Sequence, residues 1–277
     1  SARRTCLRRP DAAAVGLPAV DGDRHQRVQV VHLGRLVPDG RGAVNEKGVD
    51  FYKRLVDCLR EHGITPHATL YHWDLPQALQ DRYAGWQSRE VARDFADYVT
   101  AVVSRLGDRI DHWMPLNETA TFAWYDGYSV GKTPPHAPGL ALASEREHLQ
   151  VIHHALLAPG LGCQAIRAAS PRPCRIAIAE NFTSFVPIAE TPEHIEAARR
   201  AFDRDNANGA ILAPMLQGRF EPAWAEHNQA NLPAISAEDW AVIGQPIDEI
   251  GFNCYTGNYV RAAANADGYE VIPYFSG

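Results

Sequence analysis

The length, composition and charge of the chain limit what kind of protein it can be. Its 277 residues, 45% of them hydrophobic and 22% charged, are enough to bury one large core. A formal net charge of −6 gives no reason to expect binding to nucleic acid or to an anionic membrane. The sequence shows no run of 18 apolar residues and no signal-peptide core near its start. The five cysteines are scattered and never in CxxC spacing, so we expect no zinc site and a cytoplasmic location.

The first half of the chain alternates expected helices with expected strands. Residues 44–62 place apolar side chains at helical spacing, and Gly63 follows where a left-handed helix end would fall. Residues 66–74 are short and rich in strand-forming residues. A second helix is expected over residues 88–107, and residues 110–118, IDHWMPLNE, form the next strand.

The second half continues this alternation. A long helix is expected over residues 145–169, with a kink or break at the proline-glycine pair 159–160. A strand follows at residues 174–181, another helix at 191–206, and a last strand within 246–257. Strands separated by helices indicate a parallel sheet covered on both faces, so the fold class is α/β.

Polar side chains follow four of the expected strands. These clusters are His72-Trp73-Asp74, Asn117-Glu118, Glu180-Asn181 and Asn253 to Tyr255. In a (β/α)8 barrel the C-terminal ends of all strands meet at one face, where active sites lie. A doubly wound sheet would bring together only the strands at its switch point, and no glycine fingerprint follows the first strand. We therefore predict a (β/α)8 TIM barrel, incomplete at both ends.

Four segments of the chain resemble a known protein family. They are VPDGRGAVNEKGVDFYKRLVDCLREHGITPHATLYHWDLPQAL, DFADYV, LGDRIDHWMPLNE and IGFNCYTG. The family is that of the family 1 glycoside hydrolases, the β-glucosidases and β-glycosidases, and the resemblance runs from about Leu36 to about Val260. It implies a (β/α)8 barrel that hydrolyses terminal β-D-glycosides with retention of configuration. It also implies a small β-glycoside or oligosaccharide as substrate, with no metal and no organic cofactor.

The same resemblance implies roles for seven residues. Glu118 corresponds to the general acid/base, which protonates the leaving oxygen as an oxocarbenium-like transition state develops. Asn117 corresponds to the amide that hydrogen-bonds the sugar 2-hydroxyl. The substrate-binding residues that the resemblance implies are His72, Trp73, Asn117, Asn181, Asn253 and Tyr255.

Several of these residues have simpler explanations when each is taken alone. Glu118 could cap the following helix, and His72 could be a satisfied core histidine. Asp74 is better suited to capping or an ion pair than to chemistry. Trp113 and Trp124 could be core residues or sugar platforms, and both alternatives stay open. The Asn-Glu pair after an apolar strand, with similar clusters at three other strand ends, favours the catalytic interpretation of Glu118.

A retaining glycosidase needs a second carboxylate, the nucleophile, about 5 to 5.5 Å from the first. The family holds it in an Ile/Val-Thr-Glu-Asn-Gly motif on a later strand. Because the chain ends at Gly277 before any such motif, we expect the last two barrel strands to be absent. Glu180 imitates the motif, but the flanking residues place it on the strand directly after that of Glu118. We therefore give Glu180 the smaller weight as a nucleophile.

Residues 1–35 form an atypical Arg- and Ala-rich segment ahead of a partial barrel domain at 36–277. Four arginines lie within the first nine residues, and no helical or strand period is sustained. A shift of reading frame that ends near Leu36 explains the sharp change, and a diverged arm that binds an acidic partner is the alternative. Sequencing the coding DNA across this junction separates the two.

Two functions are therefore carried forward. The first is hydrolysis of terminal β-D-glycosides with Glu118 as general acid/base. The second is a catalytically impaired carbohydrate-binding or interaction protein derived from the same family. A partial barrel would also leave edge strands and apolar faces uncovered, and the sequence does not indicate an oligomeric state.

Overall fold

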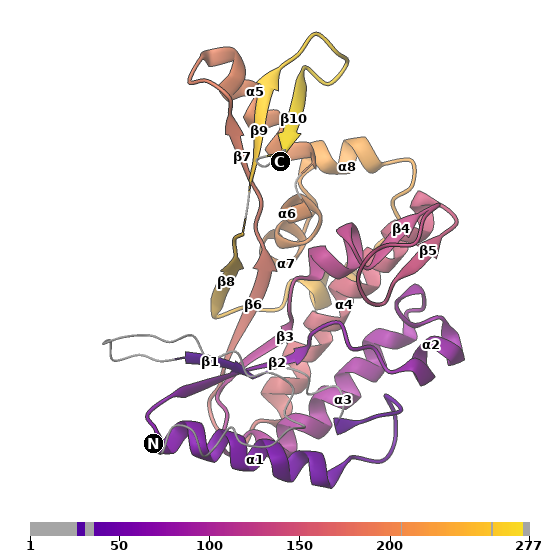
Figure 1. Ribbon diagram of the computed structural model, residues 1–277. Coiled ribbons are helices and arrows are strands. Elements are labelled where there is room, and N and C mark those ends of the chain that lie inside the picture. The colour runs from indigo at the N-terminus through magenta and orange to yellow at the C-terminus, as the bar shows by residue number, and fades with distance from the viewer. Residues whose placement is uncertain (1–26, 31–35, 206, 256, 274–277) are drawn as a thin grey trace.

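The computed structural model describes residues 27–30, 36–205, 207–255 and 257–273 (Figure 1). Its strands are β1 (Arg27–Val30), β2 (Thr65–Tyr71), β3 (His112–Leu116), β4 (Tyr128–Val130), β5 (Leu140–Leu142), β6 (Arg175–Asn181), β7 (Ser184–Pro187), β8 (Glu249–Asn253), β9 (Gly257–Ala262) and β10 (Tyr269–Pro273). Its α-helices are α1 (Glu46–Glu61), α2 (Gln77–Tyr83), α3 (Glu90–Leu106), α4 (Glu145–Ala169), α5 (Pro192–Asp205), α6 (Ala207–Ala210), α7 (Leu212–Gln217), α8 (Pro222–Asn228) and α9 (Ala237–Ile243). A 3₁₀-helix, η3 (Gly85–Gln87), and a π-helical turn, η4 (Thr121–Tyr125), complete the set.

Five strands form a central parallel sheet in the order β1-β2-β3-β6-β8. Within the described residues, the five strands lie side by side in the order in which they occur along the chain. The sheet is therefore an arc of a singly wound barrel. This confirms the predicted α/β class, and the four expected strands correspond to β2, which begins one residue earlier than expected, β3, β6 and β8. β1 lies inside residues 1–35. Most of that segment is outside the described residues. The division between an atypical segment at 1–35 and a barrel domain at 36–277 therefore stays a prediction.

The last strand of this arc has an exposed apolar side. β8 pairs with β6 in parallel, with Asn181 opposite Asn253. Along β8, Ile250 and Phe252 are exposed. The apolar face that a partial barrel was expected to leave uncovered is therefore present on this strand.

Local capping explains where the predicted helices begin and end. The Asn45 side chain accepts a hydrogen bond from the Gly48 N–H at the start of α1, and Gly63 has the left-handed φ of 71° expected after its end. At the start of α3, the Ser88 hydroxyl accepts from the Glu90 N–H. α5 begins at Pro192, where the missing N–H of proline costs the helix nothing.

The helix expected to kink or break at residues 159–160 continues through this pair without a break. α4 is one continuous helix, with Pro159 in its interior. Both Pro159 and Gly160 are buried, and α9 packs directly against this part of the helix. A Cβ atom on Gly160 would lie 2.1 Å from the carbonyl oxygen of Val242, so the glycine allows the two helices to approach closely. The pair is therefore a packing feature of α4, where the sequence indicated a kink or a break.

Gly160→Ala is expected to destabilise the protein by about 1–3 kcal/mol, since the new methyl group would push the α9 main chain away. In an unobstructed helix the same change stabilises by ~1 kcal/mol, so the sign reports the helix contact. Urea unfolding followed by circular dichroism measures the difference. A variant as stable as the wild type would show that α4 and α9 do not touch here.

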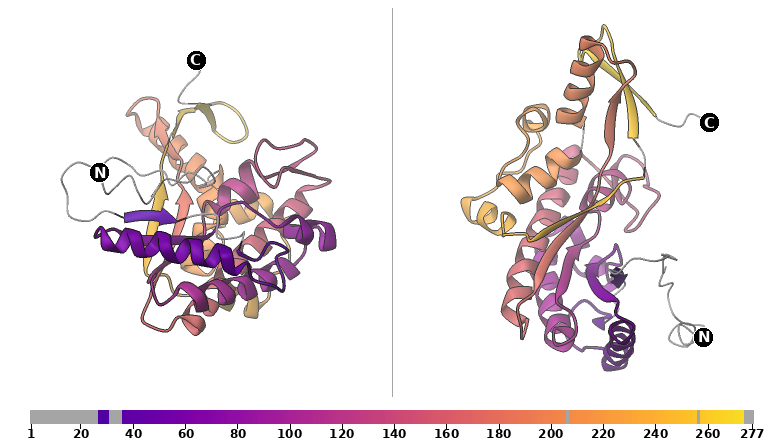
Figure 2. Two further views of the ribbon diagram at one scale, coloured as in Figure 1. Left: turned by 60° about the horizontal axis from the view of Figure 1, so that its bottom comes forward. Right: turned by 90° about the vertical axis from the view of Figure 1, so that its left-hand side faces the viewer.

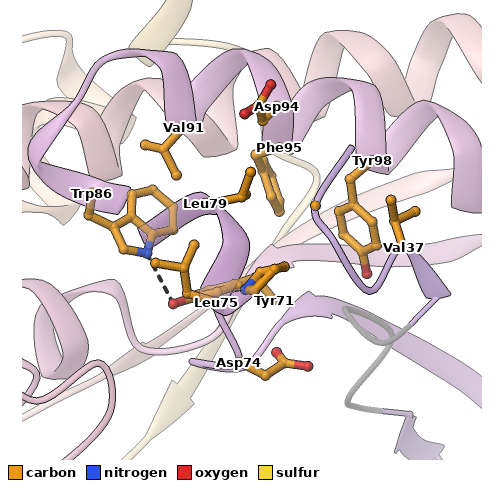
Figure 3. A pocket seen from close by; sticks show the side chains of 12 residues that line it. Val37, Tyr71, Asp74, Leu75, Leu79, Trp86, Val91, Asp94, Phe95 and Tyr98 are labelled. Carbon is orange, nitrogen blue, oxygen red and sulfur yellow. Dashed lines mark hydrogen bonds between the residues drawn. The ribbon is translucent and has the colours of Figure 1, made fainter. Parts of the chain in front are cut away.

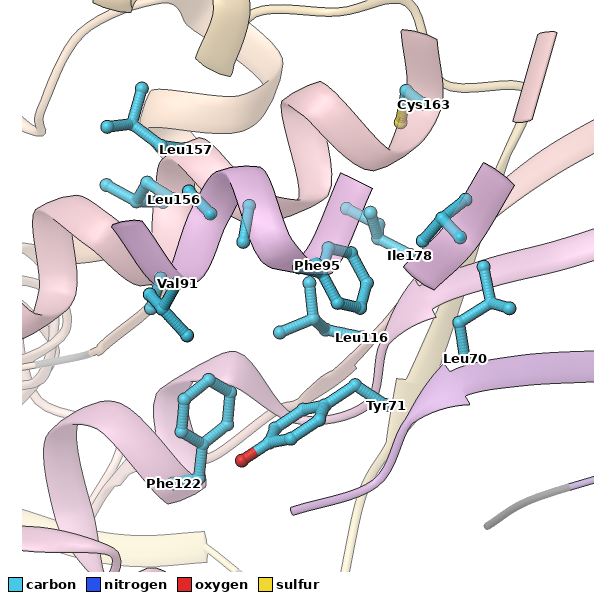
Figure 4. Close-up of a cluster of buried hydrophobic side chains, with 14 of the residues drawn as sticks. Leu70, Tyr71, Val91, Phe95, Leu116, Phe122, Leu156, Leu157, Cys163 and Ile178 are labelled. Carbon is cyan, nitrogen blue, oxygen red and sulfur yellow. The ribbon is translucent and has the colours of Figure 1, made fainter. Parts of the chain in front are cut away.

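The main hydrophobic core lies between the central sheet and the helices α3 and α4 (Figure 4). Leu70, Leu116 and Ile178 contribute to it from three neighbouring strands. Phe95 of α3 lies beside Leu116 in the close-up, and Leu156 of α4 belongs to the same cluster. The sheet residues are buried because helices cover this face, as expected for a parallel sheet.

A second, smaller sheet extends the molecule beyond the C-terminal ends of β6 and β8 (Figure 2). It has the order β10-β9-β7 and packs against α5 around a separate small core. β4 and β5 form a two-stranded parallel pair. None of these short strands was predicted from the sequence. In the described part of the chain, no helix combines the length and apolar character needed to cross a bilayer.

Candidate active site

The main chain just after β3 is held between the two neighbouring strands of the sheet. The Asn117 N–H donates to the Tyr71 carbonyl oxygen of β2 at 3.1 Å, and the Glu118 N–H donates to the Ala179 carbonyl oxygen of β6 at 2.7 Å. Glu118 adopts a left-handed φ of 52°, which is unusual for a residue with a side chain. Such backbone strain costs of order 1 kcal/mol, so the surrounding contacts must hold it in place.

Asn253, at the end of β8, contacts both Glu118 and Asn117, although β6 lies between β8 and β3. The Asn253 side-chain nitrogen Nδ2 lies 2.6 Å from Glu118 Oε1 and 3.2 Å from Asn117 Oδ1. The Glu118 residue is only 5% exposed. One amide therefore fixes both polar side chains that follow β3, although β3 and β8 are two strands apart.

Tyr255 is also directed to Glu118 but remains open to solvent, with 76% of its surface exposed. Its pKa is raised, first by desolvation and then by the charge of Glu118 and a hydrogen bond to that carboxylate. The predicted residues Asn117, Glu118, Asn253 and Tyr255 therefore gather around one carboxyl group at the C-terminal end of the sheet.

His72 and Trp73 form the turn that leaves β2. The Trp73 indole N–H donates to the Asn117 carbonyl oxygen at 3.0 Å, and Trp73 itself has a left-handed φ of 75°. The His72 ring lies 5.3 Å from the Trp73 ring, and the His72 N–H donates to Asp74 Oδ1. Asp74 thus caps the turn, as its simpler interpretation predicted. The Trp73 N–H is thus used on the main chain, and its partly buried ring also lies 5.7 Å from the His136 ring.

Asn181 lies at the end of β6, between β3 and β8. Its side-chain amide donates to the Thr121 hydroxyl at 3.2 Å, so in this structure it supports the segment after Glu118. Asn181 lies opposite Asn253 across the β6–β8 pair, and His72 lies in the turn after β2.

Glu180 is the more deeply buried of the two acids in this region, with 1% of its surface exposed. Its oxygen Oε1 accepts from the Thr119 N–H at 3.0 Å, and Oε2 accepts from the Ala120 N–H at 3.2 Å. Along β6, Ile176 and Ile178 belong to the main core, so Glu180 shares their face of the sheet. With both oxygens on main-chain N–H groups and no open face, Glu180 is not placed to attack a sugar.

The environment of Glu180 changes its ionisation. Its pKa is raised to about 7, mainly by desolvation and also by the neighbouring charge of Glu118, against the lowering effect of the Thr119 and Ala120 hydrogen bonds. The sequence did not single out this clamp on Thr119 and Ala120. The available signal was an acid on the core face of an apolar strand, which must find buried partners.

The free energy of unfolding is expected to fall as pH rises from about 4.5 to about 7. In this window folded Glu180, with its raised pKa, keeps a proton that the unfolded chain has released. This contribution is fully present below the unfolded pKa of 4.5 and is lost above about 7, a change of ~3 kcal/mol. Urea unfolding at several pH values measures the slope, which Glu180→Gln should reduce. Equal slopes in the two proteins would contradict the assignment.

Both tryptophans whose roles were left open are packing residues. Trp113 is fully buried in the main core. Trp124 stacks on His148 with ring centres 5.3 Å apart and lies 5.6 Å from Trp224. The alternative of a sugar platform is not supported for either ring.

A small cavity of about 40 Å³ lies beneath the turn that follows β2 (Figure 3). Tyr71 and Trp86 line it and are joined by a 3.0 Å hydrogen bond from the indole N–H to the phenol oxygen. Its other walls are mainly apolar, with the carboxyl groups of Asp74 and Asp94 at the edge. Ligand pockets are commonly ~300 Å³ or larger, so this space is a packing void below the site and holds no sugar. Within the described ranges, no group of three or more His, Cys, Asp or Glu side chains is arranged to bind a metal ion.

Comparison with known proteins identifies the family. The model of glycosyl hydrolase family 1 matches residues 25–271. The thermostable β-glucosidase B of Thermobispora bispora is 39% identical over 263 residues, which cover 94% of this chain and 51% of that protein. A solved rice β-glucosidase matches with a TM-score of 0.79 at 32% identity, over 92% of this chain and 57% of that one.

A second solved structure supports the same placement. It is a β-glucosidase from Thermotoga maritima in complex with deoxynojirimycin, with a TM-score of 0.76 and 32% identity over 90% of this chain and 54% of that one. The chain spans about half the length of the relatives it matches. The family match covers both the arc of parallel strands and the Glu118 cluster at its C-terminal end. The chain belongs to glycosyl hydrolase family 1.

Proposed function

We propose that the protein hydrolyses terminal β-D-glycosides, in carbohydrate metabolism, with Glu118 as the general acid/base. The observation that supports this best is the cluster of Glu118, Asn117 and Asn253 at the C-terminal end of the parallel sheet. In barrel enzymes this end of the strands holds the reacting groups. Membership of the family gives the cluster its chemical meaning.

In the proposed reaction, the Glu118 carboxyl group gives its proton to the glycosidic oxygen as the bond to the anomeric carbon breaks. The aglycone leaves as an alcohol, and positive charge develops on the sugar ring. The Glu118 carboxylate then takes a proton from the water that attacks the anomeric carbon, and the Glu118 acid is restored. Asn253 holds Glu118 Oε1, so it directs the carboxyl group during both proton transfers.

We assign the glycone contacts to Asn117, His72, Trp73, Asn181 and Tyr255. Asn117 is adjacent to Glu118, and its amide would hydrogen-bond the sugar 2-hydroxyl. The ring face of Trp73 would pack against the apolar face of the sugar, beside the His72 imidazole. The exposed Tyr255 hydroxyl is close enough to Glu118 to affect both that carboxylate and a bound ligand.

The second candidate function is carbohydrate binding without hydrolysis. Retention of configuration needs a carboxylate about 5 to 5.5 Å from the acid/base. In the described part of the chain, the acid that interacts with Glu118 is Glu180, and its oxygens are turned to the Thr119 and Ala120 N–H groups. This observation favours a chain that binds a sugar but needs a further carboxylate for turnover.

Release of nitrophenol from 4-nitrophenyl β-D-glucopyranoside separates the two functions. Turnover by the purified chain, absent with the α-anomer, supports hydrolysis. If folded protein releases no nitrophenol but binds deoxynojirimycin saturably in calorimetry, the binding function is supported. Failure in both assays would contradict both proposals.

A cytoplasmic location stays a prediction. The free thiols of Cys163, Cys174 and Cys254 support it. Fractionation of cells that produce the protein, followed by immunoblotting, would test the location. Recovery outside the cytoplasm would contradict it.

A further inference from the structure

The segment after β3 is bonded to the end of β6 at four successive residues. In each pair, one of residues 118–121 meets one of residues 179–181. The bonds join Glu118 N–H to the Ala179 carbonyl, Thr119 N–H and Ala120 N–H to the Glu180 carboxyl group, and the Asn181 amide to the Thr121 hydroxyl. Glu180 makes two of the four bonds with a single side chain.

A buried acid at this position needs an explanation. The preceding residues on the same face of β6 are Ile176 and Ile178, and an apolar side chain would suit the main core. Such a side chain would leave the Thr119 and Ala120 N–H groups without their buried acceptor. These N–H groups begin the helical turn after Glu118, where main-chain donors have no partner within the turn itself.

The clamp acts on the backbone that directs the Glu118 side chain. Glu118 needs its left-handed φ to leave β3 in this direction, and the next two peptide groups are those held by Glu180. Release of these peptide groups would allow Glu118 to relax toward ordinary helical dihedral angles. Its carboxyl group would then move away from Asn253.

We propose that Glu180 is a positioning residue for Glu118, which fixes the acid/base by holding the peptide groups of Thr119 and Ala120. The inference rests on the proposed function where it names Glu118 as the proton donor. It also assigns a use to a carboxyl group that the hydrolytic reaction itself does not require. The capping role once considered for Glu118 belongs to Glu180, and the Glu118 carboxyl group is thereby left for the substrate.

The first test is NMR spectroscopy of protein labelled with ¹⁵N in threonine, alanine and asparagine. In the wild type, the Thr119 and Ala120 amide signals should titrate with Glu180, with a midpoint of about 7. In Glu180→Gln this titration should vanish, and the Asn253 side-chain signals should shift because Glu118 has moved. Unchanged Asn253 signals in the folded variant would overturn the proposal.

The matched control is Asp239→Asn, which removes the charge of another buried carboxylate. Asp239 binds Arg89 and His153 and is 5% exposed. It should lower stability without moving the Thr119 or Asn253 signals. Equal movement of these signals in Asp239→Asn and Glu180→Gln would reduce Glu180 to a general stabilising residue and overturn the positioning role.

Kinetics on an alkyl β-D-glucoside, whose alkoxide leaving group depends on the proton from Glu118, supply the second test. Glu180→Gln should lower kcat by about 10- to 100-fold with KM changed less than about twofold, since displacement of a reacting group by about 1 Å has effects of this size. Loss of all measurable turnover, as for a missing nucleophile, or an unchanged kcat would contradict positioning. If the wild type itself shows no turnover, the hydrolytic function fails, and the NMR comparison still decides the role of Glu180.

Discussion

Glu118→Gln is expected to lower kcat/KM on an alkyl β-D-glucoside by about 10²- to 10⁴-fold, the usual contribution of a positioned general acid. An alkoxide is a poor leaving group, so its departure depends on the proton that Glu118 supplies. Glutamine retains an oxygen that can accept from Asn253 and so leaves the cluster in place, but its amide is not acidic enough to protonate the leaving oxygen. Glucose release under saturating and subsaturating substrate measures the loss.

The control for this substitution is Glu190→Gln, which changes an exposed carboxylate that follows β7. It should keep the activity and the circular dichroism spectrum of the wild type. If Glu118→Gln were folded and within threefold of wild type on the alkyl glucoside, Glu118 would not be the proton donor.

Trp86→Ala is expected to destabilise the protein by about 3–5 kcal/mol, the largest effect on folding that we predict. Trp86 is 1% exposed, and its ring centre lies 5.3 Å from that of Tyr71 and 5.1 Å from that of Phe122. Its removal would leave a cavity between β2 and the helical turn after Glu118. It would also remove the indole N–H that donates a hydrogen bond to the buried Tyr71 hydroxyl. Urea unfolding gives the change in the free energy of unfolding.

Trp86→Phe separates the two parts of this effect. It keeps an aromatic ring against Tyr71 and Phe122 and loses the indole N–H, so the loss should be clearly smaller. A loss below about 1 kcal/mol for Trp86→Ala would show that the ring is not part of the core in solution.

Elements with a strong local pattern could be predicted from the sequence. α1 has its Asn45 cap and Gly63 stop, and α5 starts at a proline. The strands β2, β3, β6 and β8 are apolar runs with polar ends, and their order along the chain is also their order in the sheet. In these elements the local signal and the packed structure agree.

Elements that depend on distant partners could not be predicted in the same way. β7 pairs with β9, although about 70 residues separate them along the chain, and each is short. The proline in α4 is accommodated by packing against α9, which local propensity does not describe. The Ser236 cap at the start of α9, which accepts from the Asp239 N–H, was a local signal that could have been used.

The site shows the same division. Because the ends of parallel strands converge, the sequence indicated that Asn117, Glu118 and Asn253 would lie together. The sequence did not indicate the Trp73 bond to the Asn117 carbonyl or the Glu180 clamp. Both depend on left-handed backbone at Trp73 and Glu118 and on the register of β3 against β6, which side-chain patterns do not encode.

The dependence of rate on the leaving group tests the central claim, that Glu118 protonates the glycosidic oxygen, most directly. Nitrophenolate leaves with little help from an acid, whereas an alkoxide needs a proton. The ratio of kcat/KM for 4-nitrophenyl β-D-glucopyranoside to that for an alkyl β-D-glucoside should therefore rise by about 10-fold or more in Glu118→Gln relative to wild type. A ratio that stays the same in the folded variant would contradict the account.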